Sequence, residues 1–81
     1  MAGYFIFNEE WSGDGYTALW LKSDGEWTTL LEDAMIVSRE KLKEYGRTYD
    51  KASAIPVGEA LKMASIVEYD RALSCKAKVR L

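Results

Sequence analysis

Histidine and glutamine are absent from this 81-residue chain, and cysteine, asparagine and proline occur once each. Without histidine there is no base for a Ser-His-Asp triad, and one cysteine supports neither a disulfide framework nor a Cys/His zinc site. The longest apolar runs have four residues, as at 4–7 and 34–37, which is too short for a secretory leader or a membrane span. The sequence therefore predicts no membrane segment and none of these enzyme classes.

What the chain does contain predicts a small folded protein. Apolar residues make up 48% of the sequence and aromatic residues 12%, enough buried surface to offset the entropy of ordering the chain. We expect a single domain over residues 1–81 with a modest core, to which self-association would add buried surface. The lone thiol, Cys75, is typical of a reducing compartment and favours the cytoplasm.

The net charge of −2 conceals an uneven distribution. Residues 1–37 carry seven acidic side chains and one basic one, whereas residues 38–81 carry ten basic and six acidic ones. Seven of the ten aromatic residues also precede residue 28. The first half of the chain is therefore acidic and aromatic, and the second half is basic.

The first half is typical of an antiparallel meander. Residues 3–8 predict a strand that is buried on both faces, and residues 9–15 predict a polar loop that holds Trp11. Asp24-Gly25 predicts a two-residue type I′ turn between strands at 16–22 and 26–31. That register pairs Lys22 with Trp27 and places Trp20 and Trp27 on one face.

The second half predicts helices and a last strand. Ser38 is a favourable N-cap for a helix over 39–53, although Gly46 could instead end that helix at Tyr45. Pro56 predicts the start of a short helix, and 66–70 predict one arm of a second hairpin. The alternation over 73–81 predicts a strand. The expected fold class is α+β, with an antiparallel sheet made of an N-terminal three-stranded meander plus a C-terminal strand or hairpin, and one or two short helices packed on one face.

Several local patterns resemble catalytic or ligand-binding motifs but lack the context that the chemistry needs. Ser38 and Lys41 fit the S-x-x-K spacing without its companion motifs, and Gly13-Asp14-Gly15 precedes a strand rather than a helix. The carboxylates do not follow calcium-loop spacing, and Cys75 lies on the apolar side of its predicted strand. We therefore expect no catalytic residue, no metal site and no cofactor.

The acidic and aromatic half predicts a surface for a protein partner that is itself basic. Trp11 is the expected exposed anchor, while the helices either cover Trp20 and Trp27 or leave them open. Carboxylates around Trp11, together with the other acids nearby, would steer association and imitate phosphate charge. The predicted partner-binding residues are Glu9, Glu10, Trp11, Asp14, Tyr16, Trp20, Asp24, Glu26, Trp27, Glu32 and Asp33.

This surface predicts a non-catalytic inhibitor or adaptor that occupies a nucleic-acid-binding or other basic site. In size and charge the chain is similar to small phage anti-defence proteins such as anti-CRISPR inhibitors, although no motif assigns it to such a family. The alternative is direct binding of single-stranded nucleic acid, in which aromatic side chains stack on bases and Lys76, Lys78 and Arg80 contact phosphates. The same cations would also protect an exposed edge strand, and the overall acidity disfavours the alternative.

Overall fold

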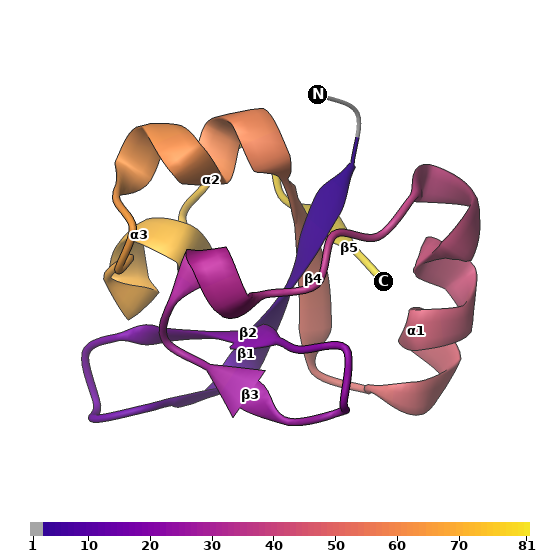
Figure 1. Ribbon diagram of the computed structural model, residues 1–81, viewed down its shortest axis with the longest axis horizontal. Helices are drawn as coiled ribbons and strands as arrows, with labels where there is room; N and C mark the ends of the chain where they lie inside the picture. The colour runs from indigo at the N-terminus through magenta and orange to yellow at the C-terminus, as the bar shows by residue number, and fades with distance from the viewer. Residues whose placement is uncertain (1–2) are drawn as a thin grey trace.

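A computed structural model describes residues 3–81 and contains a five-stranded antiparallel sheet in the order β3-β2-β1-β4-β5 (Figure 1). The central strand β1 (Tyr4–Ser12) pairs with β2 (Ala18–Leu21) on one side and with β4 (Ala52–Pro56) on the other. The edges are β3 (Trp27–Thr28) and β5 (Val79–Arg80). The α+β class, the N-terminal meander and the C-terminal strand are therefore confirmed.

In the described part of the chain, three short α-helices pack against the sheet. α2 (Val57–Met63) and α3 (Tyr69–Leu73) lie on one side of it, and α1 (Leu42–Thr48) lies on the other (Figure 1). Two 3-10 turns complete the elements, η1 (Leu31–Asp33) and η2 (Arg39–Lys41). The helices thus divide between the two faces rather than sharing the one face that we predicted.

Both faces need a cover because β1 is apolar on each side. Phe5 and Phe7 belong to a first core cluster with Trp20 and Ile55, while Ile6 belongs to a second. The first cluster also takes buried residues from α2 and α3: Val57, Ala60 and Ala72. The second is closed by residues of α1 and of the segments beside it: Val37, Leu42, Tyr45 and Tyr49.

The β2–β3 hairpin is present, but its register differs by one residue from the predicted one. Leu21 pairs with Trp27, and the Lys22 amide donates to the Glu26 carbonyl at 2.8 Å, so the loop has three residues. Among residues 3–81 no residue other than glycine has a positive φ, which rules out a type I′ turn here, whereas Gly25 at φ 88° fits a type I turn with a glycine bulge. A shift of one residue exchanges the faces, so Trp27 packs against the second cluster and Trp20 lies in the first. The predicted surface that carries both tryptophans is therefore wrong.

The helix predicted over 39–53 is shorter and continues through Gly46. Ser38 makes no side-chain capping hydrogen bond, and the α-helix ends at Thr48, where Tyr49 turns extended. The chain then enters β4, a strand that we did not predict. Ala52 and Ala54 of this strand have weak strand propensity, but both are buried and paired with β1. This tertiary pairing outweighs the propensity.

The C-terminal segment contains less strand than its alternation suggests. The predicted arm at 66–70 is instead a buried Val67 followed by the start of α3. Two turns then occupy the chain, in which the Cys75 amide donates to Ala72 and the Lys78 amide to Cys75. Within 73–81 only Val79–Arg80 pairs with β4, so most residues of the alternating pattern lie outside the strand.

Candidate functional site

A bulge in β1 sets the geometry of the candidate site. Five residue steps separate Phe7 from Ser12, whereas two steps separate their partners Trp20 and Ala18. The side-chain oxygen of Asn8 accepts hydrogen bonds from the amides of Glu10 and Trp11, at 2.9 and 3.0 Å, which stabilises the bulged backbone. Bulges turn a side chain away from its regular direction, and Trp11 is 65% exposed. Because β1 extends to Ser12, Trp11 lies in a strand rather than in the predicted loop.

Beside this bulge lies a groove of about 370 Å³. Its walls come from the bulged end of β1, from β3, and from the turn between α1 and β4. Trp27 and Tyr49 meet edge to face, with ring centroids 5.5 Å apart and planes at 78°. We call this the aromatic groove and define it by Glu10, Trp11, Trp27, Tyr49, Asp50 and Lys51.

The charged residues of the aromatic groove are solvent-exposed. Glu10 and Asp50 supply two carboxylates and Lys51 one ammonium group. No ion pair within residues 3–81 involves any of the three. Aromatic faces beside free carboxylates form an environment that attracts a cation, because the π-face and the carboxylate both carry negative potential.

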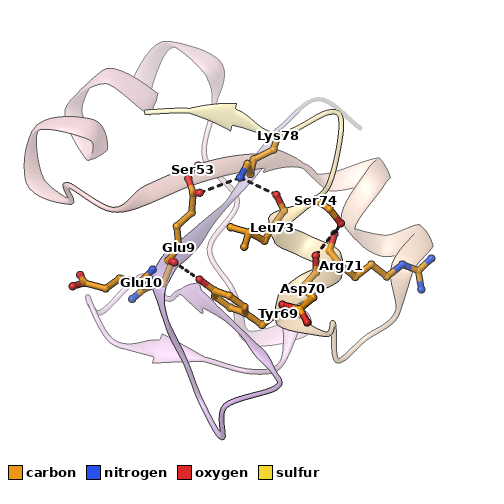
Figure 2. Close-up of polar contacts among 10 residues, drawn as sticks. Glu9, Glu10, Ser53, Tyr69, Asp70, Arg71, Leu73, Ser74 and Lys78 are labelled. Atoms are coloured by element: carbon orange, nitrogen blue, oxygen red, sulfur yellow. Dashed lines mark hydrogen bonds and ion pairs between the residues drawn. The ribbon is translucent and has the colours of Figure 1, made fainter.

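Glu9 is adjacent to Glu10 but lies in a separate polar cluster on the opposite side of the sheet (Figure 2). Its carboxylate accepts a hydrogen bond from the Ser53 hydroxyl and one from the Lys78 ammonium, the latter at 3.0 Å. The Tyr69 hydroxyl donates to the main-chain carbonyl of Glu9. Figure 2 shows the Glu10 side chain extending away from this cluster.

The Glu9–Lys78 pair is largely removed from water, since the two side chains are 17% and 20% exposed. Burial by itself raises the pKa of Glu9, but the hydrogen bonds from Ser53 and Lys78 and the positive charges of Lys78 and Arg80 outweigh it. The pKa of Glu9 is therefore lowered, and the carboxylate is charged at neutral pH. A predicted partner-binding acid and a predicted phosphate-binding lysine thus neutralise each other inside the molecule.

Two further predicted acids serve the local turns. Asp14 accepts hydrogen bonds from the amides of Tyr16 and Thr17 at 2.8 and 2.7 Å, and these bonds lower the pKa of Asp14. Asp24 accepts from the Glu26 amide at 2.9 Å, and its pKa is lowered mainly for the same reason. Both carboxylates act as turn-forming groups, a common use of aspartate at such positions.

The remaining predicted residues do not line the aromatic groove. Trp20 is completely buried, and within residues 3–81 its indole N–H has no hydrogen-bond partner, so it is not part of the surface. Tyr16 is 80% exposed, and Glu26, Glu32 and Asp33 are exposed as well, all outside the groove. Of the sequence-predicted set, the structure brings together Glu10, Trp11 and Trp27.

Three groove residues escaped the sequence analysis. Tyr49, Asp50 and Lys51 fall in the turn before β4, where we predicted the end of a helix. The signal for the strand lies in residues 52–57, because a residue that precedes proline, here Ile55, is typical of an extended segment. A strand predicted there would have ended the helix earlier and revealed the turn before it.

Comparison with known protein families, with curated proteins and with solved structures gives no match for this chain. Within residues 3–81, no group of three or more His, Cys, Asp or Glu side chains is placed to hold a metal ion. No helix in the described part of the chain is long and apolar enough to cross a membrane.

Proposed function

We propose that this protein is a non-catalytic interaction module, an inhibitor or adaptor, whose aromatic groove binds a basic segment of a partner protein. The observation that carries the proposal is the exposed Trp11 beside the Trp27–Tyr49 pair, with the carboxylates of Glu10 and Asp50 at the rim. An arginine or lysine side chain of the partner would lie against the rings and pair with the carboxylates.

The energetics of such a contact favour aromatic groups at its centre. Tryptophan, tyrosine and arginine are the side chains that most often dominate binding energy at protein interfaces. A cation over an aromatic face contributes about 0.5–2 kcal/mol, depending on how far water is excluded. The acidic rim of Glu10 and Asp50 would mainly raise the association rate and select against acidic partners.

A partner segment rich in arginine is also the kind of segment that contacts phosphates. A module that covers it would compete with nucleic acid, which supports the inhibitor form of the proposal and the comparison with phage anti-defence proteins. The free, half-buried thiol of Cys75 suits a reducing compartment, and we keep the cytoplasm as the expected location.

The nucleic-acid alternative has less support from the arrangement of its residues. Trp20 is buried and unable to stack on a base, and Lys78 is bonded to Glu9. Lys76 and Arg80 remain exposed. Self-association of the chain stays a prediction.

The test compares two exposed aromatic residues in one binding assay. Short fluorescent peptides that contain arginine, and matched peptides with glutamate in its place, are titrated with the protein. Trp11→Ala should weaken arginine-peptide binding at least about tenfold, whereas Tyr16→Ala should leave it unchanged because Tyr16 lies outside the groove. Equal affinities of all three proteins would contradict the proposal.

A charge-reversal pair tests the rim in the same assay. Glu10→Lys with Asp50→Lys should abolish the preference for arginine peptides, while Glu32→Lys with Asp33→Lys applies the same change of net charge outside the groove. If both double variants lose binding equally, the attraction is a general effect of net charge and the groove is not the site. Glu9 and Asp14 are unsuitable for this test because their carboxylates make hydrogen bonds that stabilise the folded protein.

A further inference from the structure

A second groove, of about 220 Å³, lies between the start of the α1 region and the edge strand β5. It shares no residue with the aromatic groove. Its charged residues are cations, whereas the aromatic groove has two carboxylates and one lysine. We call it the basic groove and define it by Arg39, Leu42, Lys43, Val79, Arg80 and Leu81.

The cations of the basic groove, Arg39, Lys43 and Arg80, are exposed, and the ion pairs within residues 3–81 involve other lysines. The charge of Arg80 also acts on Glu9, but these two residues are not among the ion pairs of residues 3–81. The Arg39 guanidinium donates to the Tyr4 hydroxyl at 2.8 Å, which restricts where it points. The fold thus gathers positive charge from two segments that are distant in the sequence, and the complementary ligand is an anion.

The floor of the basic groove is apolar. Leu42, Val79 and Leu81 belong to the second core cluster or pack against it, so a ligand that fills the groove needs an apolar group as well as negative charge. Among residues 3–81 no aromatic side chain lines the groove, so it lacks the stacking surface that single-stranded nucleic acid uses. These properties favour a peptide over a nucleic acid.

The neighbouring strand supplies a place for the peptide backbone. β5 pairs with β4 along one edge, and within residues 3–81 no strand pairs with its other edge. A free edge can pair with an extended segment of another chain. We propose that the basic groove binds an acidic, extended segment of a partner protein, with an apolar side chain on the Leu42–Val79 floor and carboxylates on Arg39, Lys43 and Arg80.

This inference goes beyond the function proposed for the aromatic groove and does not depend on it. The basic groove lies at the start of the α1 region, whereas Tyr49 and Asp50 of the aromatic groove follow the end of that helix. Two separate grooves of opposite preference would let one small protein hold two partners, which is the arrangement of an adaptor.

Short fluorescent probes test the predicted ligand. The first is a peptide of alternating glutamate and leucine; the second replaces glutamate with lysine, the third replaces leucine with serine, and the fourth is an oligo(dT) strand. At low ionic strength the glutamate–leucine peptide should bind tightest by fluorescence anisotropy. Equal or tighter binding of oligo(dT) would overturn the peptide assignment in favour of nucleic acid, and binding of the serine peptide at full strength would remove the role of the floor.

Matched variants locate the binding site. Lys43→Glu with Arg80→Gln should weaken the glutamate–leucine peptide at least about tenfold, while Arg47→Glu with Lys76→Gln makes the same charge change outside the groove and should have little effect. Equal losses, or none, would overturn the proposal. Circular dichroism checks that each variant is folded, and Glu10→Lys with Asp50→Lys should not weaken this peptide, which keeps the test separate from that of the aromatic groove.

Discussion

Glu9 and Glu10 are chemically identical neighbours on β1 that have opposite surroundings. Glu9 faces the side of α2 and α3, where Ser53 and Lys78 hold its carboxylate in a largely buried cluster. Glu10 faces the other side, at the rim of the aromatic groove, with a carboxylate that no cation within residues 3–81 pairs with. The cover on each face, and not the residue type, decides which acid stabilises the fold and which can meet a partner.

The same contrast holds for the two faces of the sheet. α2, α3 and the segment between them cover the first face (Figure 1). The second face is covered chiefly by α1, whose seven residues span roughly 10 Å, while the nine residues of β1 correspond to roughly 30 Å of strand. A helix this short leaves room at both of its ends, and the two grooves occupy that room.

The strongest way to break this contrast is to remove the cation from the closed side. Lys78→Met leaves the Glu9 carboxylate without its partner in a mostly buried position, and we expect a loss of about 3 kcal/mol in the free energy of unfolding, measured by urea denaturation. The control Lys76→Met, at an exposed position, should change it by less than about 0.5 kcal/mol. Adding Glu9→Gln to Lys78→Met should recover part of the loss, and equal stability of the two lysine variants would contradict the structural role.

A smaller effect is expected from the hydroxyl in the same cluster. Ser53→Ala removes one hydrogen bond to the Glu9 carboxylate at a completely buried site and should cost about 1–2 kcal/mol of unfolding free energy. Ser74→Ala is the comparison and should cost less, because within residues 3–81 the Ser74 hydroxyl donates only to nearby main-chain carbonyls at an exposed position. The reverse order of the two losses would argue against the Glu9 cluster.

Acid titration sharpens the contrast through the charge of Glu9. Because folding lowers the pKa of Glu9, its carboxylate stabilises the protein above the ordinary glutamate value of about 4.5, and that contribution is lost as the pH falls through the lower folded value. Glu9→Gln should therefore show a shallower fall in stability below about pH 4.5, measured by denaturant unfolding at several pH values. Some slope should remain, since the pKa values of Asp14 and Asp24 are lowered too. Identical slopes would contradict the prediction.

The smallest change in stability is expected on the open side. Trp11→Ala should alter the free energy of unfolding by less than about 0.5 kcal/mol, because the ring is 65% exposed, while it removes the main anchor of the aromatic groove. Thermal denaturation together with the arginine-peptide titration separates the two effects. A large loss of stability would show that Trp11 is part of the core and not a binding residue.

Much of the N-terminal sheet could be predicted because its signals are local. An apolar run marks β1, and Asp24-Gly25 marks the hairpin. The register could not be predicted in the same way, because Asp24 tolerates either of two turn types and the choice depends on how Trp20 and Trp27 pack on opposite faces. Tertiary packing, and not turn propensity, fixed the alignment.

The candidate site was predictable to the same extent. Exposed Trp11 and its acidic neighbour Glu10 follow from composition, whereas Tyr49 and Asp50 reach the groove only because the unforeseen strand β4 ends the preceding helix early. The pairing of Glu9 with Lys78 joins residues 69 positions apart, and no local pattern encodes it. Contacts between residues so far apart in the chain are not predicted by local patterns in a single sequence.

The three-residue loop between β2 and β3 has a consequence for how this protein tolerates insertions and deletions. Loss of Ser23 would leave Lys22 opposite Glu26 and Leu21 opposite Trp27, with Asp24-Gly25 as a two-residue type I′ turn. Trp27 would keep its face and its edge-to-face contact with Tyr49, so the aromatic groove would keep this wall. Strand pairing, and not the length of the loop, is thus the property on which the groove depends, and a protein with this shorter loop should retain partner binding.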